Sequence, residues 1–530
     1  MESTTSYARS RTLSRNDRAN TTFNLFCVAL CLLAALSFFY LPLPTLQWFT
    51  DYWEHASALR VLSEHPFSPT NPHYATYDPD RQFIPMFVLL GGLMHITGIS
   101  VETALALAAV ITTVLFCVGV KIFAAEYFQH RWAPVVTMAV LLFCWGNPWI
   151  WTGFYEFRAI FHINYYPAAL DLSLTFIAWG LVIRALRRAS LDLLTVAGLP
   201  FLTAFMFITH QLGGLFAVGG MVLFIALESA HSTRTRLNIF LLITAGMAVT
   251  WWWPYFNPIK LTIYGAGDKE NGGVPQFYYP LQVMLLIGPA WLGIPVLLEM
   301  LRKRTHLALV AGFICLSCAY LLGGVVGHPV AHRFLSYTVI YLHLPIAWKL
   351  LKLISDRPGQ PAPLPAAQRR AFIVVAALVV MAQSGLAAVD FARVAYERQT
   401  GKSFGNFPYQ NVRSELAAAI QTVPKDAILF ASSDPALSVT AYKGKVVARP
   451  RAQLMIADGP ARSRDNQRFF APDASQQERM ALIRKYGASY ILIKPDNVPG
   501  EVVKHLKELG QLVPNDGSLI LIKIDTSTSS

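Results

Sequence analysis

Long apolar runs separated by short polar segments occupy most of the first 390 or so residues of the chain. A run of about 17–25 apolar residues has the length that an α-helix needs to cross a bilayer. Such runs occur at 21–43, 102–124, 134–152, 168–186, 191–209, 212–229, 237–253, 281–301, 305–325, 334–351 and 371–391. The pattern therefore predicts a multi-span α-helical membrane protein with about 11 transmembrane helices.

A further apolar run at 82–98 is short and follows a polar stretch. If it crossed the membrane, nearly all the basic loop clusters would lie outside, against the preference of Lys and Arg for the cytoplasmic side. We therefore predict a juxtamembrane helix here, within an external loop at 44–101. The N-terminus is then cytoplasmic and the C-terminal region extracytoplasmic.

The composition changes after about residue 393 to that of a soluble domain. Helix-like stretches at 411–423, 475–487 and 500–509 alternate with strand-like runs at 427–430, 445–448, 490–493 and 519–524. Alternation of this kind favours a small α/β layer. We predict two domains: a transmembrane domain at 1–392 that includes the external loop 44–101, and a C-terminal extracytoplasmic α/β domain at 393–530.

The composition agrees with a membrane protein, since 54% of the residues are hydrophobic and 14% are charged. Soluble domains carry about 25% charged residues, which excludes a single soluble globule. The net charge is +13, but the excess Lys and Arg lie in loops between apolar runs, so no nucleic-acid partner is expected. The lipid bilayer is the predicted partner, and the plasma (inner) membrane is the predicted location.

All six cysteines lie in apolar segments, so no disulfide is expected in the polar regions. Cys315 and Cys318 do not complete a tetrahedral metal site without further His or Cys nearby. We expect no cofactor and no metal site, and the sequence does not support a catalytic divalent cation.

The most informative polar motif follows the first apolar run and contains Asp51, Glu54 and His55. The i, i+3, i+4 spacing places the three side chains on one face of a helix. A carboxylate there could act as general base toward a hydroxyl nucleophile, because partial burial raises its pKa. The alternative is a solvated helix start with Asp51 near the N-cap.

Three later segments are also predicted to be external, at 153–167, 254–280 and 326–333. Glu156, Arg158 and His162 lie among aromatic residues, which suits sugar binding but also an interfacial aromatic belt. Lys269, beside two glycines, could reach an anion or be merely solvated. The late cluster, which we expect to bind a phosphate, contains His328, His332 and Arg333. The two histidines could instead bind a metal, but Pro329 argues against a regular helical turn there.

The order of these parts resembles the GT-C superfamily of integral membrane glycosyltransferases, which use polyprenyl-phosphate-linked sugars as donors. The resemblance covers the first span, the acidic motif that opens a long external loop, the juxtamembrane element, the multi-span core and the C-terminal α/β domain. It implies that Asp51 acts as catalytic base or positions the acceptor, and that Glu156 assists it. External cations are expected to contact the donor phosphate, and Arg333-Phe334 is similar to a late-loop arginine of related bacterial proteins.

Two departures narrow the expected activity. The Trp-Trp-Asp motif of oligosaccharyltransferases is absent from the C-terminal domain, which argues against transfer to asparagine. The second loop lacks an Asp-x-Asp or Asp-x-Glu pair, which argues against a catalytic divalent cation.

The predicted function is that of a lipid-phosphate-sugar-dependent hexosyl- or pentosyltransferase. It would move the sugar to an acceptor hydroxyl of a glycan, lipid or protein on the extracytoplasmic face, with inversion. The alternatives are a transporter or flippase for a lipid-linked glycan, a glycan polymerase or ligase, and a structural membrane component with a solute-binding outer domain.

Overall fold

The computed structural model describes residues 2–40, 50–146, 155–228, 232–264, 275–328, 330–354, 366–400, 412–450, 455–515 and 517–525. The chain divides into two compact units. The helical unit comprises Met1–Pro42, Leu105–Trp253 and Asn257–Ala392. The mixed unit comprises Leu43–Ala104, Pro254–Phe256 and Arg393–Ser530. The loop at 44–101 that was predicted to be external therefore belongs to the same unit as the C-terminal region.

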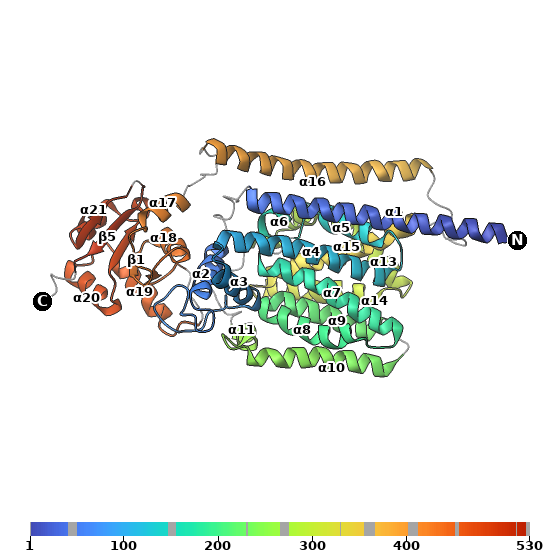
Figure 1. Ribbon diagram of the computed structural model, residues 1–530, viewed down its shortest axis with the longest axis horizontal. Coiled ribbons are helices and arrows are strands. Elements are labelled where there is room, and N and C mark those ends of the chain that lie inside the picture. Colours follow the sequence, from blue (N-terminus) through green and yellow to red (C-terminus); the bar gives the residue numbers. More distant parts are fainter. Residues whose placement is uncertain are drawn as a thin grey trace. The chain divides into compact units, whose positions relative to one another are not determined.

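The helical unit is built from helices that lie side by side with their axes roughly aligned (Figure 1). Its elements are α1 (Glu2–Ala35), η1 (Leu36–Tyr40), α4 (Val101–Phe128, whose first turn belongs to the mixed unit), α5 (Ala133–Phe143), α6 (Phe157–Ile163), α7 (Pro167–Arg188), α8 (Leu193–Thr209), α9 (Gln211–Leu227), α10 (Thr233–Val249), η3 (Thr250–Trp252), α11 (Pro258–Tyr264), η6 (Pro275–Tyr278), α12 (Pro280–Ile287), η7 (Gly288–Leu292), α13 (Gly293–Arg302), α14 (Leu307–Val325), η8 (Ala331–Arg333), α15 (Phe334–Leu353) and most of α16 (Ala366–Thr400). Helix α7 packs on α8 and α9, and α15 packs on α5, α13 and α14.

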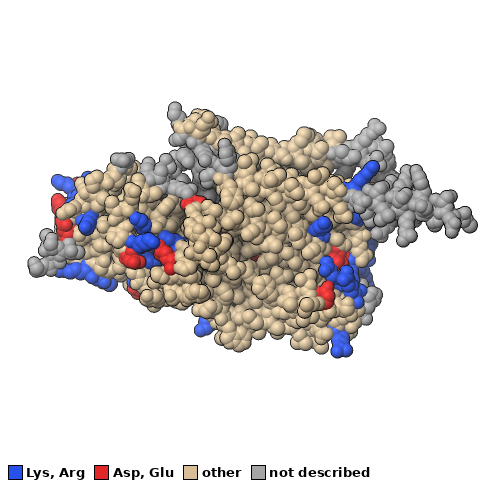
Figure 2. Space-filling model, in the orientation of Figure 1, with Lys and Arg blue, Asp and Glu red and all other residues tan. Residues whose placement is uncertain are grey.

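Six helices among the described residues are long and apolar enough to cross a membrane. They are Arg18–Phe39, Val101–Phe128, Pro167–Arg188, Pro280–Arg302, Leu307–Val325 and Ala331–Leu353. Shorter apolar helices accompany them, and the visible face of the helical unit carries few charged side chains except at one end (Figure 2). The chain is therefore a mostly helical, multi-span membrane protein, while the count of about 11 spans stays a prediction.

The mixed unit contains a five-stranded sheet of order β2-β1-β3-β5-β4. Strands β1 and β2 and strands β1 and β3 pair in parallel, whereas β5 pairs antiparallel with both β3 and β4. Its elements are α2 (Thr50–Glu64), α3 (Pro85–Thr97), α17 (Val412–Ala419), β1 (Ile428–Ala431), α18 (Ser433–Ser438), η9 (Val439–Ala441), β2 (Lys445–Val446), α19 (Gly459–Phe469), α20 (Gln476–Tyr486), β3 (Tyr490–Ile493), η10 (Pro495–Asn497), α21 (Gly500–Lys507), β4 (Gly510–Val513) and β5 (Ile520–Ile524).

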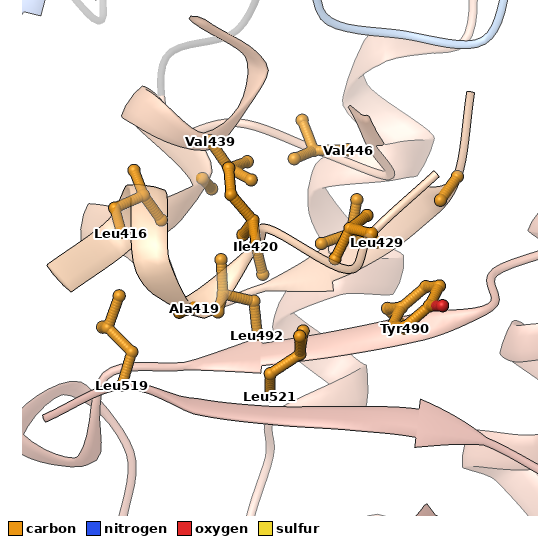
Figure 3. Packing of buried hydrophobic residues seen from close by; sticks show 14 of the residues in the cluster. Leu416, Ala419, Ile420, Leu429, Val439, Val446, Tyr490, Leu492, Leu519 and Leu521 are labelled. Carbon is orange, nitrogen blue, oxygen red and sulfur yellow. The ribbon is translucent and has the colours of Figure 1, made fainter. Parts of the chain in front are cut away.

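Both faces of the sheet are buried around β1 and β3, which explains why these two strands are apolar at every position. In β3, Tyr490 and Leu492 belong to one core cluster, together with residues of α17 (Figure 3). Ile491 and Ile493 belong to a second cluster, which includes residues of α20 and α21. This division follows from the period of two along a strand.

The segment predicted as a juxtamembrane helix forms α3, which packs against α2. The approach is close at Gly91, where an added Cβ would lie 2.4 Å from the Leu62 Cβ atom. The helix has 13 residues, fewer than the roughly 20 that a bilayer span requires. Leu89, Leu93 and Ile96 are exposed on it, a feature typical of a helix that lies at a membrane surface. Its placement in the membrane stays a prediction.

The two-sided core predicts a clear difference between two leucines of the same sheet. Leu492 in β3 is 0% exposed, whereas Leu512 in β4 is 54% exposed. Leu492→Ala should lower the free energy of unfolding of the sheet by about 2–5 kcal/mol, through lost burial and the cavity left behind. Leu512→Ala is the matched control and should have a far smaller effect. Hydrogen exchange of the β1 and β3 amides in the full chain measures both, and equal effects would contradict the packing described.

Candidate functional site

Helix α2 brings the predicted acidic motif together at its N-terminal end. Asp51 lies in the first turn, where the partial positive charge of the helix N-terminus stabilises a carboxylate. Glu54 and His55 follow about one turn later, and both are buried. Asp51 itself is only partly buried. The three predicted residues therefore differ in their access to solvent.

The Glu54 carboxylate accepts hydrogen bonds from two segments that are distant in sequence. Its Oε2 atom accepts from Arg81 Nη2 at 3.2 Å and from Gln82 Nε2 at 3.0 Å. Its Oε1 atom accepts from Arg449 Nη2 at 3.4 Å. A carboxylate that is paired with two guanidinium groups is held in its ionised form and is a weak proton acceptor. These contacts favour a structural role for Glu54, whose predicted catalytic role stays a prediction.

His55 is a buried member of the same hydrogen-bond network. Its Nδ1 atom lies 3.0 Å from Gln82 Oε1, so Nδ1 carries the proton and donates it, while Gln82 Nε2 donates to Glu54. The ring packs on Phe87, with the ring centroids 4.8 Å apart. Burial lowers the pKa of His55, opposed by the charges of Asp51 and Glu54. A neutral, fully packed histidine orients the loop but carries no charge for an anionic ligand.

Asp51 and Arg81 form the accessible edge of this cluster. The Arg81 side chain is 42% exposed, in contrast to 3% for Glu54. The pKa of Arg81 is raised mainly by the charge of Glu54 and further by Asp51 and Asp80. A partly exposed carboxylate thus lies within electrostatic range of a partly exposed guanidinium, which together can accept a proton and bind an anion. Arg81 was not among the residues predicted from the sequence.

The docking of the first loop onto the C-terminal sheet fixes the position of α2. Thr440 in η9 is the centre of these contacts, because its Oγ1 atom lies 2.9 Å from both Ser57 Oγ and His73 Nδ1. Its carbonyl accepts from Arg60 Nε at 2.8 Å. The loop also reaches the edge of β2, where the Val446 N–H donates to the His73 carbonyl at 2.8 Å. Helix α2 is therefore held by residues nearly 400 positions later in the sequence.

In the helical unit, the second predicted loop is anchored to α4. Asn164 Nδ2 donates to the Ala109 carbonyl at 3.0 Å and also to Thr113 Oγ1. Tyr155 Oη donates to Asn164 Oδ1 at 3.0 Å. Of the predicted residues, Glu156 is fully buried just before α6, and His162 is buried near its end. Arg158 in the same helix is partly buried.

The residues of the late predicted cluster, His328, His332 and Arg333, differ in burial. His332 is buried and stacks on Phe277, with ring centroids 5.5 Å apart, whereas His328 and Arg333 are exposed. The two histidines thus lie in different environments, which argues against a shared ligand. Lys269 lies outside the described residues. Within those residues, no three His, Cys, Asp or Glu side chains are grouped as a metal ion would require.

A buried carboxylate in α7 was missed from the sequence, because it falls within a predicted span. Asp171 is 0% exposed, and neither of its oxygens has a hydrogen-bond partner among the described residues. It faces Gly213 near the start of α9, where His210 caps the helix by accepting the Gly213 N–H at 3.0 Å. Tyr337 interacts electrostatically with both Asp171 and Arg333, and His210 also interacts with Arg333. Ionisable residues inside membrane helices usually serve function.

The close approach of Gly213 to Asp171 is directly testable. An added Cβ at Gly213 would lie 2.0 Å from Asp171 Oδ2, so Gly213→Ala must displace a fully buried carboxylate. We expect a clear loss of thermal stability for the full chain in detergent. Gly219→Ala in the same helix is the control, because no atom lies within 4 Å of its added Cβ. Equal melting temperatures for the two variants would contradict the packing of α7 on α9.

The buried position of Asp80 predicts a defined pH dependence. Burial raises the pKa of Asp80 to about 6, opposed by the Gln82 N–H bonded to its Oδ1 at 2.7 Å. Glu54 raises this pKa further, while Arg81 and Arg449 lower it. Because the folded state holds this proton more tightly than the unfolded state, the contribution of Asp80 to stability falls as pH rises from about 4 to about 6.

Asp80→Asn removes the cost of ionising a buried carboxyl group and keeps an oxygen that can accept the Gln82 N–H. Relative to the wild type, the variant should gain stability as pH rises through this window, by at most about 3 kcal/mol above pH 6. Thermal unfolding of both proteins between pH 4 and 8 measures the difference. Asp78→Asn removes a carboxylate from the same loop and is the control. A difference that does not change with pH would show that Asp80 does not titrate as described.

Comparison with known proteins places this geometry in a known fold. No family model matches the chain, and no curated protein matches its sequence. Among solved structures, ArnT from Cupriavidus metallidurans is similar with a TM-score of 0.55 and 12% identity, over 95% of this chain and 98% of ArnT. The oligosaccharyltransferase of Archaeoglobus fulgidus is similar with a TM-score of 0.52 and 13% identity, over 88% of this chain and 69% of that enzyme.

Arabinofuranosyltransferase AftD from Mycobacteria also matches, with a TM-score of 0.48 and 14% identity. The match covers 90% of this chain, which spans 40% of the length of AftD. The likeness to ArnT and to the archaeal oligosaccharyltransferase extends over most of this chain, so it includes both units. The chain therefore has the fold of the GT-C membrane glycosyltransferases.

Proposed function

We propose that the protein is an integral membrane glycosyltransferase that moves a sugar from a polyprenyl-phosphate donor to an acceptor hydroxyl. The transfer takes place on the extracytoplasmic face of the plasma membrane, with the N-terminus in the cytoplasm. The observation that carries the proposal is the electrostatic interaction between Asp51 and the half-exposed Arg81 at the accessible end of α2, in a chain with the GT-C fold.

The proposed reaction is a single displacement at the anomeric carbon. Asp51 accepts the proton of the acceptor hydroxyl, and the oxygen forms a bond to the anomeric carbon. The bond from that carbon to the phosphate oxygen breaks, and the polyprenyl phosphate leaves with the electron pair. Arg81 stabilises the charge that develops on the leaving phosphate. One displacement inverts the anomeric configuration.

The half-exposed state of Arg81 suits this role, because its guanidinium can meet a ligand although its Nη2 atom contacts Glu54. Arginine binds phosphate oxygens through planar, paired hydrogen bonds. The ester bond to phosphate already activates the donor, so no nucleotide is needed at the external face. Asp51 is preferred as base over Glu54, since Asp51 is more accessible and Glu54 is held by two arginines.

Arg333 of the helical unit is proposed, separately from Asp51 and Arg81, as a phosphate-binding residue. Arg333 is exposed, which suits the phosphate contact predicted for it from the sequence. Glu156 and His162 are buried in the second loop, so they are better suited to hold that loop in place than to transfer protons. The sugar is either a hexose or a pentose, and the acceptor is a glycan, a lipid or a protein.

Asp51→Asn tests the proposed base. The variant keeps the shape of the side chain but cannot accept the proton, so we expect transfer to fall by about 10²–10⁴-fold. The assay follows release of polyprenyl phosphate from radiolabelled polyprenyl-phosphate sugars by purified protein. Binding of the donor should change little, because the wild-type carboxylate is the group that receives a proton and not the group that holds the phosphate.

Asp78→Asn in the same loop is the control and should retain activity. Wild-type protein that binds these donors but never releases polyprenyl phosphate would favour the transporter or flippase alternative. Unchanged release by Asp51→Asn would exclude Asp51 as the base while leaving the transferase proposal open to another carboxylate.

A further inference from the structure

We propose that Arg449 of the C-terminal region is a positioning residue for the donor phosphate, because it neutralises Glu54 and so leaves Arg81 available to an anionic ligand. The inference rests on the proposed function, in which Arg81 meets that phosphate. It assigns the C-terminal sheet an electrostatic part in a site whose proposed base, Asp51, and phosphate-binding Arg81 both lie in the first loop.

The geometry divides the Glu54 carboxylate between two arginines. Arg449 approaches Oε1, and Arg81 approaches Oε2 together with Gln82. The Arg449 side chain is 0% exposed, so it cannot meet a ligand in solvent. The Arg81 side chain is 42% exposed. The buried Arg449 guanidinium is thus available only to groups inside the protein such as Glu54, whereas the Arg81 guanidinium contacts Glu54 and is also exposed to solvent.

The local charges show why the second arginine matters. Arg81 interacts electrostatically with three carboxylates, those of Glu54, Asp51 and Asp80. Arg449 acts on Asp80 as well as on Glu54. Without Arg449, a single guanidinium would face all three carboxylates, and an arriving phosphate would have to compete with them for Arg81. A buried carboxylate left without its partner also attracts the remaining cation more strongly, because the local dielectric is low.

The sheet holds Arg449 in place with little freedom to move. Arg449 follows Val447 and Ala448, which are buried beside β2. The Val447 N–H donates to the Leu429 carbonyl of β1 at 3.0 Å, which fixes the chain two residues before Arg449. The loop that carries Arg81 is fixed to the same edge through His73 and Val446. The two arginines therefore approach Glu54 from segments that are tied to one another.

The test measures binding of undecaprenyl phosphate to the full chain in detergent micelles, beside thermal stability. Arg449→Met should weaken binding by about tenfold or more, the loss expected when a charge-assisted contact is diverted. Arg449→Lys keeps the charge and should bind nearly as the wild type does. Removing the carboxylate as well, in Glu54→Gln with Arg449→Met, should restore binding, because Arg81 is then released.

Arg479→Met is the matched control for the loss of a buried arginine. Arg479 is 1% exposed and donates to the carbonyls of Phe469 and Ala471. Its replacement should lower stability but leave binding of undecaprenyl phosphate unchanged. The comparison separates an electrostatic effect on the site from a general loss of folding.

Three outcomes overturn the inference. Equal binding by the wild type and Arg449→Met would do so while leaving the proposed function intact. Failure of Glu54→Gln to restore binding in the double variant would show that Arg449 does not act through this carboxylate. A wild type that binds undecaprenyl phosphate no better than undecaprenol would remove the donor assignment, and this inference with it.

Discussion

The first loop and the C-terminal sheet depend on one ionic contact, the Glu54 carboxylate held between Arg81 and Arg449. Glu54 belongs to α2, Arg81 to the loop that leads into α3, and Arg449 to the segment after β2. An ion pair buried at this depth must satisfy its hydrogen bonds, because desolvation of each charge costs several kcal/mol. The three segments can therefore adopt few arrangements relative to one another without leaving a charge uncompensated.

Further hydrogen bonds then refine the position that this ion pair sets. Thr440 contacts Ser57 on α2 and His73 in the loop. Arg60 donates to the carbonyl of Thr440 in η9 and to the carbonyl of Gly444 just before β2. Helix α2 thus holds Asp51 in a fixed position relative to the sheet. Precision of this kind matters for a base, since proton transfer requires donor and acceptor within hydrogen-bond reach.

Periodicity and composition predict much of the fold. Strands β1, β3 and β5 lie within one residue of apolar runs that the sequence marks, and α20 and α21 match helix-like stretches. β4 was not expected, because Gly510, Gln511 and two apolar residues form no clear alternating pattern. The spacing of Asp51, Glu54 and His55 correctly anticipates a helix, since local spacing is readable from sequence.

The residues that pair with Glu54 cannot be predicted from local spacing in the sequence. Arg81 lies 27 residues from Glu54, and Arg449 lies 395 residues from it. Neither sits in a periodic segment that would indicate its direction. Asp171 was overlooked for a different reason, since a single acid hardly lowers the apolar character of a long run. Charge pairing across distant segments is set by the tertiary fold, which a pattern in one stretch does not contain.

The bond between Val446 and His73 also bears on how such a protein can be divided or recombined. β2 is an edge strand of the sheet, and the first loop covers its outer side at this point. A C-terminal fragment produced alone would expose that edge, and exposed edges invite aggregation by strand pairing. Chimeras between proteins of this fold would accordingly have to exchange residues 43–104 together with residues 393–530, because both segments belong to one compact unit.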